Sequence, residues 1–134
     1  VERSIVGEGS EIYGKVYNSV IGTDVVIGEN TVVRDSIIMN GASIAGDSSL
    51  EKTIVAEHAA IGDHVIIGEG EELPNDTRPD IYREGLVVIA EDAVVPSGVS
   101  SGKNVMINGI TQKEDYPDGR LESGRTLNKE GEAE

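Results

Sequence analysis

The stretch that decides the fold is residues 21–71, which divide into three blocks of one design: IGTDVV-IGENTV-VRDSI (21–37), IMNGAS-IAGDSS-LEKTI (38–54) and VAEHAA-IGDHVI-IGEGE (55–71). Each block holds groups of six, six and five residues, so equivalent positions recur every 17 residues. Every group begins with an aliphatic residue, which gives the columns Ile21/Ile38/Val55, Ile27/Ile44/Ile61 and Val33/Leu50/Ile67. Small or branched residues follow four positions later, in the columns Val25/Ala42/Ala59 and Thr31/Ser48/Val65. A short fixed period of this kind is typical of a β-helix.

Turn-forming residues separate the columns, as in Gly22-Thr23-Asp24, Gly28-Glu29-Asn30 and Gly62-Asp63-His64. Glycine and Asx residues tolerate positive φ, so each triplet is predicted to form a sharp corner between two short strands. An amphipathic helix would lack a corner every six residues, and a meander would show longer alternating strands. We therefore predict an all-β chain, a single-stranded parallel β-helix of hexapeptide repeats in which each strand pairs with the strand one coil away.

The β-helix is predicted to span residues 1–108, with one inserted loop. The first coil is shorter than the others, as expected of a cap or of a junction with a preceding domain. Residues 71–85, EELPNDTRPDIYREG, are polar and contain two prolines, which pair poorly inside a sheet. After this loop the aliphatic pattern resumes at Leu86. Residues 109–134 are polar and show no period, so we predict a largely flexible C-terminal tail.

The acidic composition narrows the classes of partner. The chain has 11 Lys and Arg against 25 Asp and Glu, a formal net charge of -14. Such a surface repels phosphate backbones and anionic lipids, so we expect neither nucleic-acid nor membrane binding. No segment approaches the roughly 20 apolar residues of a membrane span. The absence of Cys excludes a disulfide framework and is compatible with a reducing cytosol, so we expect a cytoplasmic protein.

His58 and His64 are the only histidines, and both fall in predicted corners. Many acyltransferases built on six-residue β-helices use a corner histidine as the base, so a stand-alone acyltransferase using His58 or His64 is one hypothesis. The alternative is that both are ordinary exposed corner residues. Two histidines without Cys or a suitably spaced third ligand do not predict a metal site. Nucleotide-binding and serine-hydrolase motifs are also absent, so we expect no catalytic residues and no cofactor within this chain.

Arg78 and Arg83 are conspicuous in the loop of this acidic protein. They flank Pro79-Asp80-Ile81-Tyr82, and guanidinium groups suit the recognition of phosphate or carboxylate. One interpretation is an anion-binding site. The other is that the arginines pair with the neighbouring Asp80 and Glu84.

Three segments carry a family resemblance: SIVGEGSEIYGKVYNSVIG (4–22), VRDSIIMNGASI (33–44) and DIYREGLVVIAEDAVVPSG (80–98). They resemble the C-terminal β-helix domain of glucose-1-phosphate adenylyltransferase, also called ADP-glucose pyrophosphorylase. The last segment is the most specific, because a strand that follows an interrupting loop and leads to an Asp-Ala corner and Pro-Ser-Gly exceeds the general hexapeptide pattern.

The resemblance implies a left-handed winding and a nucleotidyltransferase domain upstream, absent from this chain. In that family the catalytic domain joins ATP and glucose 1-phosphate, with Mg²⁺, to give ADP-glucose for glycogen or starch synthesis. The β-helix domain contributes to a tetramer and to control by phosphorylated metabolites. We therefore expect the chain's partners to be its own catalytic domain, further copies in a homo-oligomer, and a phosphorylated effector. The chain alone is expected to be inactive.

The resemblance also points to effector residues. Arg83 falls where the plant-type members of this family have a lysine that helps bind the effector, and Arg78 lies nearby on the same loop. The second lysine of that pattern, just before the Asp-Ala corner, is replaced here by Glu91. Arg83 is therefore the main candidate for effector binding, Arg78 is the second, and Glu91 argues against a plant-like response.

Overall fold

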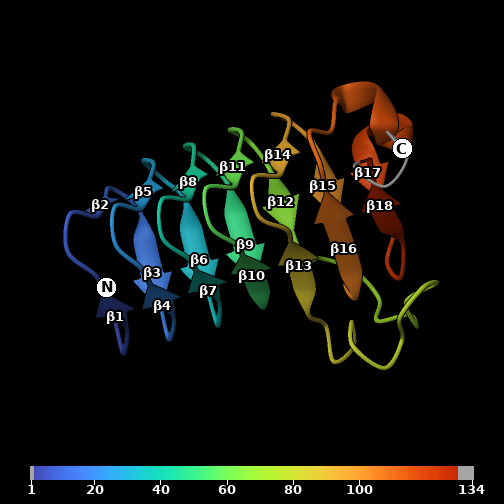
Figure 1. Ribbon diagram of the computed structural model, residues 1–134, viewed down its shortest axis with the longest axis horizontal. Coiled ribbons are helices and arrows are strands. Elements are labelled where there is room, and N and C mark those ends of the chain that lie inside the picture. Colours follow the sequence, from blue (N-terminus) through green and yellow to red (C-terminus); the bar gives the residue numbers. More distant parts are fainter. Residues whose placement is uncertain (1, 130–134) are drawn as a thin grey trace.

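Stacked short strands form a parallel β-helix, which confirms the predicted architecture (Figure 1). The computed structural model describes residues 2–129. The β1 face is the sheet of β1 (Ile5–Val6), β4 (Val20–Ile21), β7 (Ile37–Ile38), β10 (Thr53–Val55), β13 (Val87–Ile89), β16 (Val105–Asn108) and β18 (Thr126–Asn128). The β2 face is the sheet of β2 (Glu11–Ile12), β5 (Val26–Ile27), β8 (Ser43–Ile44), β11 (Ala60–Ile61) and β14 (Val94–Val95). The β3 face is the sheet of β3 (Lys15–Tyr17), β6 (Val32–Arg34), β9 (Ser49–Glu51), β12 (Ile66–Ile67), β15 (Ser100–Ser101) and β17 (Arg120–Leu121).

The aliphatic columns form the core, as the sequence predicts. Ile21 pairs with Ile38, and Val33 pairs with Leu50, so the period of the sequence is the register of the sheets. The side chains in the three aliphatic columns are at most 3 % exposed. Burying each Val, Ile or Leu stabilises the fold by about 1.5–3 kcal/mol. Because backbone pairing and side-chain stacking share one period, each coil is stabilised by its neighbours.

Buried hydroxyl groups explain why some columns contain Ser and Thr. Ser36 N–H donates to Ser19 Oγ at 3.0 Å, and Thr53 N–H donates to Ser36 Oγ at 3.1 Å. A second ladder runs from Thr31 to Ser48, whose Oγ accepts from Val65 N–H at 3.1 Å. These hydroxyls satisfy corner N–H groups that would otherwise be buried without partners, at a cost of about 1–3 kcal/mol each.

The corners differ from the prediction in the role of their glycines. The residues with positive φ are the third in each triplet, at +55° in Asp24, +62° in Asn30 and +56° in His64. The glycine that opens each corner is needed because the next coil lies close. A Cβ on Gly28, for example, would come within 2.6 Å of the backbone nitrogen of Gly46.

The loop at residues 71–85 interrupts the three-sided β-helix, which we call the prism, but the strands before and after the loop still pair with each other. Ile37 pairs with Ile54, 17 residues later, whereas Thr53 pairs with Val87, 34 residues later. The insertion therefore adds one repeat length while the strands on either side remain in register. This confirms the predicted loop and the resumption of the repeat.

The prediction of a flexible tail is wrong for residues 109–129. Two short 3₁₀ turns, η1 (Lys113–Asp115) and η2 (Pro117–Gly119), lead into β17 and β18, which pair with β15 and β16. Tyr116 and Leu121 are 2 % and 6 % exposed and fill the interior of this last coil. The period is lost because the 3₁₀ turns lengthen the coil, so that β16 and β18 partners are 20 residues apart. The remaining residues of the predicted tail, 130–134, lie outside the described part of the chain.

Among residues 2–129, the structure has no helix that is long and apolar enough to cross a membrane.

Candidate functional site

Two buried asparagines anchor the inserted loop to the prism. Asn104 is 3 % exposed, and its side-chain amide donates to the Leu73 carbonyl at 2.9 Å. Its side-chain oxygen accepts from Gly85 N–H at 2.8 Å. Asn104 thus holds both ends of the loop. Its φ of +57° suits Asn better than most residues, so the backbone and the hydrogen bonds require the same side chain.

Asn75, which is also 3 % exposed, fixes the middle of the loop. Its amide group donates to the Asn104 carbonyl at 2.8 Å, and its side-chain oxygen accepts from the backbone N–H groups of Thr77 and Arg78. The same oxygen accepts from the Thr126 hydroxyl at 3.1 Å. The loop is therefore tied to the last coil and holds its arginines in defined positions.

Arg78 is neutralised by its neighbour. Its Nε and Nη2 donate to Asp80 at 3.1 and 3.0 Å in a forked ion pair. Hydrogen bonds from Arg78 hold the pKa of Asp80 below its usual value. Of the two interpretations of Arg78, an anion-binding site or an ion pair with a neighbouring carboxylate, the structure shows the ion pair. This pairing leaves the guanidinium less available to a ligand.

Two lysines from other coils flank Gly85, two residues after Arg83 in the chain. Gly85 sits between them, since a Cβ there would lie 3.5 Å from Lys52 Cδ and 3.6 Å from Lys103 Cδ. Lys52 Nζ donates to the Glu84 carbonyl at 3.3 Å. Within residues 2–129, no carboxylate lies within ion-pair distance of Arg83, Lys52 or Lys103. We call Lys52 and Lys103, together with Arg83 two residues before Gly85, the basic cluster.

A pocket adjoins the basic cluster. It has a volume of about 240 Å³ and is lined by loop residues together with Asn104. Its walls are mixed, with Leu73, the two prolines and Tyr82 on the apolar side and Glu72 and Arg83 on the polar side. Such a pocket is suited to a small ligand with an anionic end near Arg83. Glu91, which replaces the second lysine of the plant-type pattern, is exposed and follows β13 at its far end.

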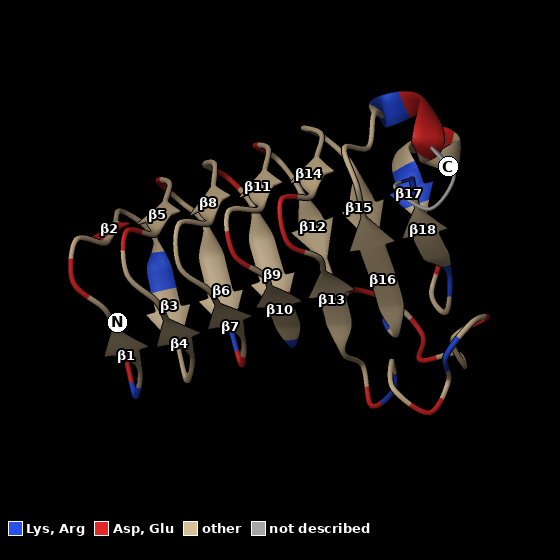
Figure 2. Cartoon of the chain, in the orientation of Figure 1, with Lys and Arg blue, Asp and Glu red and all other residues tan. Residues whose placement is uncertain are grey.

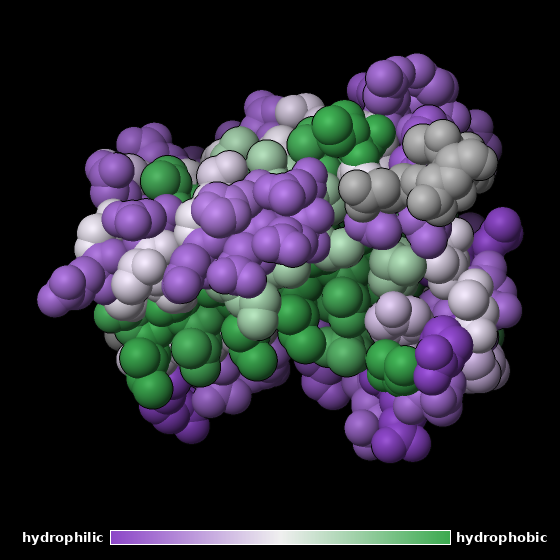
Figure 3. Space-filling view, viewed as in Figure 1, coloured by the Kyte–Doolittle hydropathy of each residue, from purple (hydrophilic) through white to green (hydrophobic). Residues whose placement is uncertain are grey.

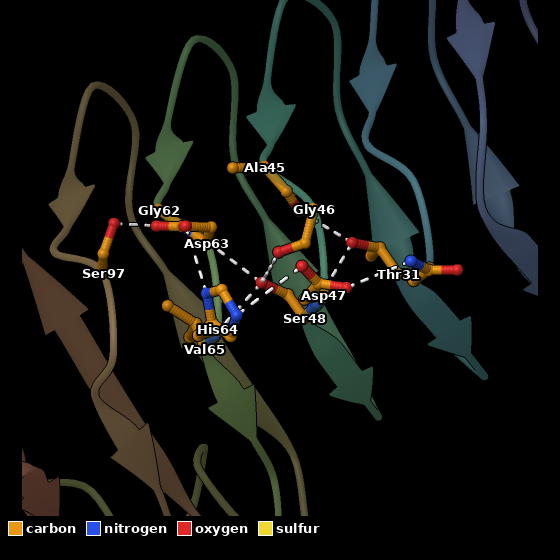
Figure 4. Close-up of polar contacts among 11 residues, drawn as sticks. Thr31, Ala45, Gly46, Asp47, Ser48, Gly62, Asp63, His64, Val65 and Ser97 are labelled. Atoms are coloured by element: carbon orange, nitrogen blue, oxygen red, sulfur yellow. Dashed lines mark hydrogen bonds and ion pairs between the residues drawn. The ribbon is translucent and has the colours of Figure 1, made fainter.

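His64 takes part in a stack of corners (Figure 4). Its Nδ1 lies 3.1 Å from Asp63 Oδ2, and its Nε2 lies 3.6 Å from Asp47 Oδ2. Asp47 in turn accepts from Asn30 at 3.2 Å. Hydrogen bonding with Ser97, followed by that with His64, keeps the pKa of Asp63 below its usual value. Both ring nitrogens of His64 therefore face carboxylates, an arrangement that joins successive corners.

His58 also packs on a corner. Its ring lies over Gly41, where a Cβ would come within 2.5 Å of His58 Cδ2. His58 and His64 lie on different corners. These contacts do not test either histidine as a base, so acyl transfer by His58 or His64 stays a prediction. Within the described residues there is no group of three or more His, Cys, Asp or Glu side chains arranged to hold a metal ion.

Comparison with known families adds to this geometry. Residues 1–89 match the model of the GlmU-like C-terminal hexapeptide family. The chain belongs to this family. Its relatives include the glucose-1-phosphate adenylyltransferase of Lachnospira eligens, 62% identical over 132 residues, and that of Ruminiclostridium cellulolyticum, 54% identical over 134 residues. The enzyme of the same name from Acetivibrio thermocellus is 40% identical over 134 residues.

These alignments cover 98% to 100% of this chain but only 31% to 32% of the relatives. The chain therefore spans about a third of the length of the relatives it matches. The resemblance to glucose-1-phosphate adenylyltransferase inferred from the sequence is confirmed.

Proposed function

We propose that this chain is the regulatory and assembly domain of a glucose-1-phosphate adenylyltransferase that makes ADP-glucose for glycogen synthesis. The observation that carries the proposal is the identity of 40% to 62% to enzymes of that name along nearly the whole chain. In the longer protein, a separate nucleotidyltransferase domain would bind ATP and Mg²⁺ and carry out the chemistry. The protein is proposed to be cytoplasmic and to act as a homo-oligomer, a tetramer at full length.

The basic cluster is the proposed binding site for a phosphorylated metabolite. Lys52 and Lys103 flank Gly85, two residues after Arg83, although the chain has a net charge of -14. A guanidinium and two ammonium groups can surround a phosphate from several sides, and such charge-assisted hydrogen bonds contribute about 1.5–3 kcal/mol each. Asn75 and Asn104 anchor the backbone of the loop that carries Arg83, which reduces the ordering cost of the loop when an anion binds.

The catalytic part of the proposal is tested by pyrophosphate release from ATP and glucose 1-phosphate in the presence of Mg²⁺. We expect release by the longer protein that contains this sequence and none by the 134-residue chain alone. Release by the chain alone, or no release by the longer protein, would reject the proposed function.

The effector site is tested by Arg83→Ala in the longer protein, with Arg78→Ala as the matched control. Fructose 1,6-bisphosphate and inorganic phosphate serve as probes. We expect Arg83→Ala to raise the half-saturating probe concentration about tenfold or more, since one charge-assisted contact is lost. Arg78→Ala should change it less than twofold, because Asp80 already occupies that guanidinium. Equal effects of the two substitutions would contradict the assignment of Arg83.

A further inference from the structure

The first coil has a shorter corner than the coil that follows it. Two residues, 13 and 14, link β2 to β3, whereas four residues, 28–31, link β5 to β6. The strands on both sides of this corner nevertheless pair in register. The second corner therefore extends beyond the first and is left partly uncovered. A hollow of about 360 Å³ lies at this place, lined by Tyr13, Gly14, Lys15, Asn30 and Val32.

Tyr13 supplies an aromatic surface at the hollow. Of the four tyrosines, all in the described part of the chain, only Tyr13 is largely exposed, at 59%. Its backbone N–H donates to the Ile27 carbonyl at 2.9 Å, and its hydroxyl donates to Glu11 Oε1 at 2.6 Å. The residue is thus held at both ends. An exposed ring that is already fixed can stack on a ligand with little loss of side-chain entropy.

Polar side chains around the hollow offer both donors and acceptors. The Asn30 amide donates to Asp47 at 3.2 Å, which leaves the oxygen of this side chain available as an acceptor. Further along β3 and β6, Arg34 Cζ lies 4.7 Å from the centre of the Tyr17 ring. Within residues 2–129, neither Lys15 nor Arg34 has a carboxylate at ion-pair distance. Figure 2 shows the cationic part of β3 in blue, between corners that carry red acidic residues.

The mixture of charges favours an uncharged ligand with many hydroxyl groups. The carboxylates of Glu11 and Asp47 are hydrogen-bonded to residues that line the hollow, so they would repel an anion such as a nucleotide. The net charge of -14 adds to this repulsion. A sugar can instead donate to the carboxylates and accept from Lys15. The C–H groups on the flat face of a sugar ring can cover Tyr13. The hollow therefore suits a carbohydrate.

The position of the hollow favours a chain of sugars over a single one. Tyr13 and Tyr17 are four residues apart, which corresponds to at most about 13 Å along the backbone. A ligand that reaches from Tyr13 to the Tyr17–Arg34 pair must therefore contain several linked rings. This polar surface is distinct from the β1 face, whose exposed Ile5 and Val20 contribute to the hydrophobic band in the lower part of Figure 3.

We propose that the hollow beside Tyr13 binds an α-glucan, a chain of α-linked glucose residues. The choice of sugar rests on the proposed function. ADP-glucose is consumed when its glucosyl group is transferred to a hydroxyl of a growing glucan and ADP leaves. A glucan held on this chain would keep synthesis of the glucosyl donor close to the acceptor. The volume of about 360 Å³ lies at the lower end of the range of about 300–1,000 Å³ found for ligand sites.

A nuclear magnetic resonance titration of the ¹⁵N-labelled 134-residue chain tests the class of ligand. We expect maltotetraose to bind with a dissociation constant of about 1 mM or below. The largest shift changes should fall on the amides of Tyr13, Gly14, Lys15 and Asn30. Cellotetraose, which has the same length and β linkages, should bind at least about fivefold more weakly. Equal binding of the two sugars, or AMP binding at these amides more tightly than maltotetraose, would overturn the assignment to an α-glucan.

Variants of Tyr13 test the stacking surface in the same titration. Tyr13→Ala should weaken maltotetraose binding at least about tenfold, whereas Tyr13→Phe keeps the ring and should stay within about threefold of the parent chain. Ile5→Ala is the matched control, because Ile5 belongs to the same coil and is 69% exposed on the β1 face. Unchanged core amides should show that each variant is folded. No binding by the parent chain, or equal binding by Tyr13→Ala, would overturn the proposal.

The longer protein that contains this sequence tests whether the hollow is open in the whole molecule. Electrophoresis in a native gel that contains glycogen should retard this protein, and Tyr13→Ala should abolish the retardation. No retardation, or retardation that survives Tyr13→Ala, would overturn the proposal. The two proposals fail separately. A lack of pyrophosphate release would reject the proposed function without changing the maltotetraose titration, and a lack of sugar binding would leave pyrophosphate release unchanged.

Discussion

Replacing Asn104 by Ala should release the inserted loop while the prism remains folded. Two side-chain hydrogen bonds are lost, from the amide to Leu73 and from Gly85 N–H to the side-chain oxygen. Each loss costs about 1–2 kcal/mol when its partner stays buried. Holding Ala at a φ of +57° costs about 1 kcal/mol more. The two lost hydrogen bonds, about 2–4 kcal/mol together, favour an open loop, because an open loop can satisfy the same groups with water. The backbone cost stays with the corner before β16.

The expected result is local opening, measured by hydrogen exchange and by limited trypsin cleavage after Arg83, since Pro79 blocks cleavage after Arg78. Exchange at Gly85 N–H should be at least about 30-fold faster in Asn104→Ala, whereas the core amides of β7 to β11 should be unchanged. Asn104→Gly should recover about 1 kcal/mol, because it relieves the backbone strain without restoring the hydrogen bonds.

Asn30→Ala is the control for the backbone contribution. Asn30 has a φ of +62°, close to that of Asn104, but its side-chain hydrogen bond to Asp47 is exposed. This variant should lose only about 1 kcal/mol and leave the loop closed. The reasoning is refuted if Asn104→Ala lowers the stability of the whole prism without accelerating exchange or cleavage in the loop.

Two further predictions concern the core. Burial raises the pKa of Tyr116 to about 12, so above pH 10 the unfolded state loses a proton that the native state keeps, and stability falls as pH rises. Urea unfolding between pH 9 and 12 should show a loss of about 1.4 kcal/mol per pH unit above pH 10, which Tyr116→Phe removes and Tyr13→Phe does not. Ile44→Ala should lower the free energy of unfolding by about 2–5 kcal/mol, whereas Val26→Ala on the exposed surface should change it by less than about 0.5 kcal/mol; equal effects would contradict the inward assignment of the column.

Several features of the site became visible only in three dimensions. Arg83 and Arg78 stand out in the sequence as cations in an acidic loop, but their neighbours decide their availability. Asp80 forms an ion pair with Arg78, while Lys52 and Lys103, from coils before and after the loop, flank Gly85 two residues after Arg83. The two lysines are 31 and 20 residues from Arg83 in the sequence, so no local pattern connects them with it.

The six-residue spacing does not predict the final coil. Its interior is filled by Tyr116 and Leu121, which are separated by 3₁₀ turns and not by the six-residue spacing. Because its aliphatic residues do not recur every six positions, the sequence pattern alone predicts a tail for this segment. The segment is polar overall, but Tyr116 and Leu121 are enough to fill the end of the prism. The edges of β15 and β16 are free to pair with β17 and β18.

By itself, the sequence determined the repeat, the inward columns and the position of the loop, because the period of a β-helix is written directly into the spacing of its aliphatic residues. It also carried the family resemblance. The tertiary structure alone decided that the loop is anchored by Asn75 and Asn104, and that the last coil closes. It also revealed the hollow beside Tyr13, where the first corner is shorter than the second. These features depend on contacts between residues far apart in the chain, whose energies arise only after the coils have stacked.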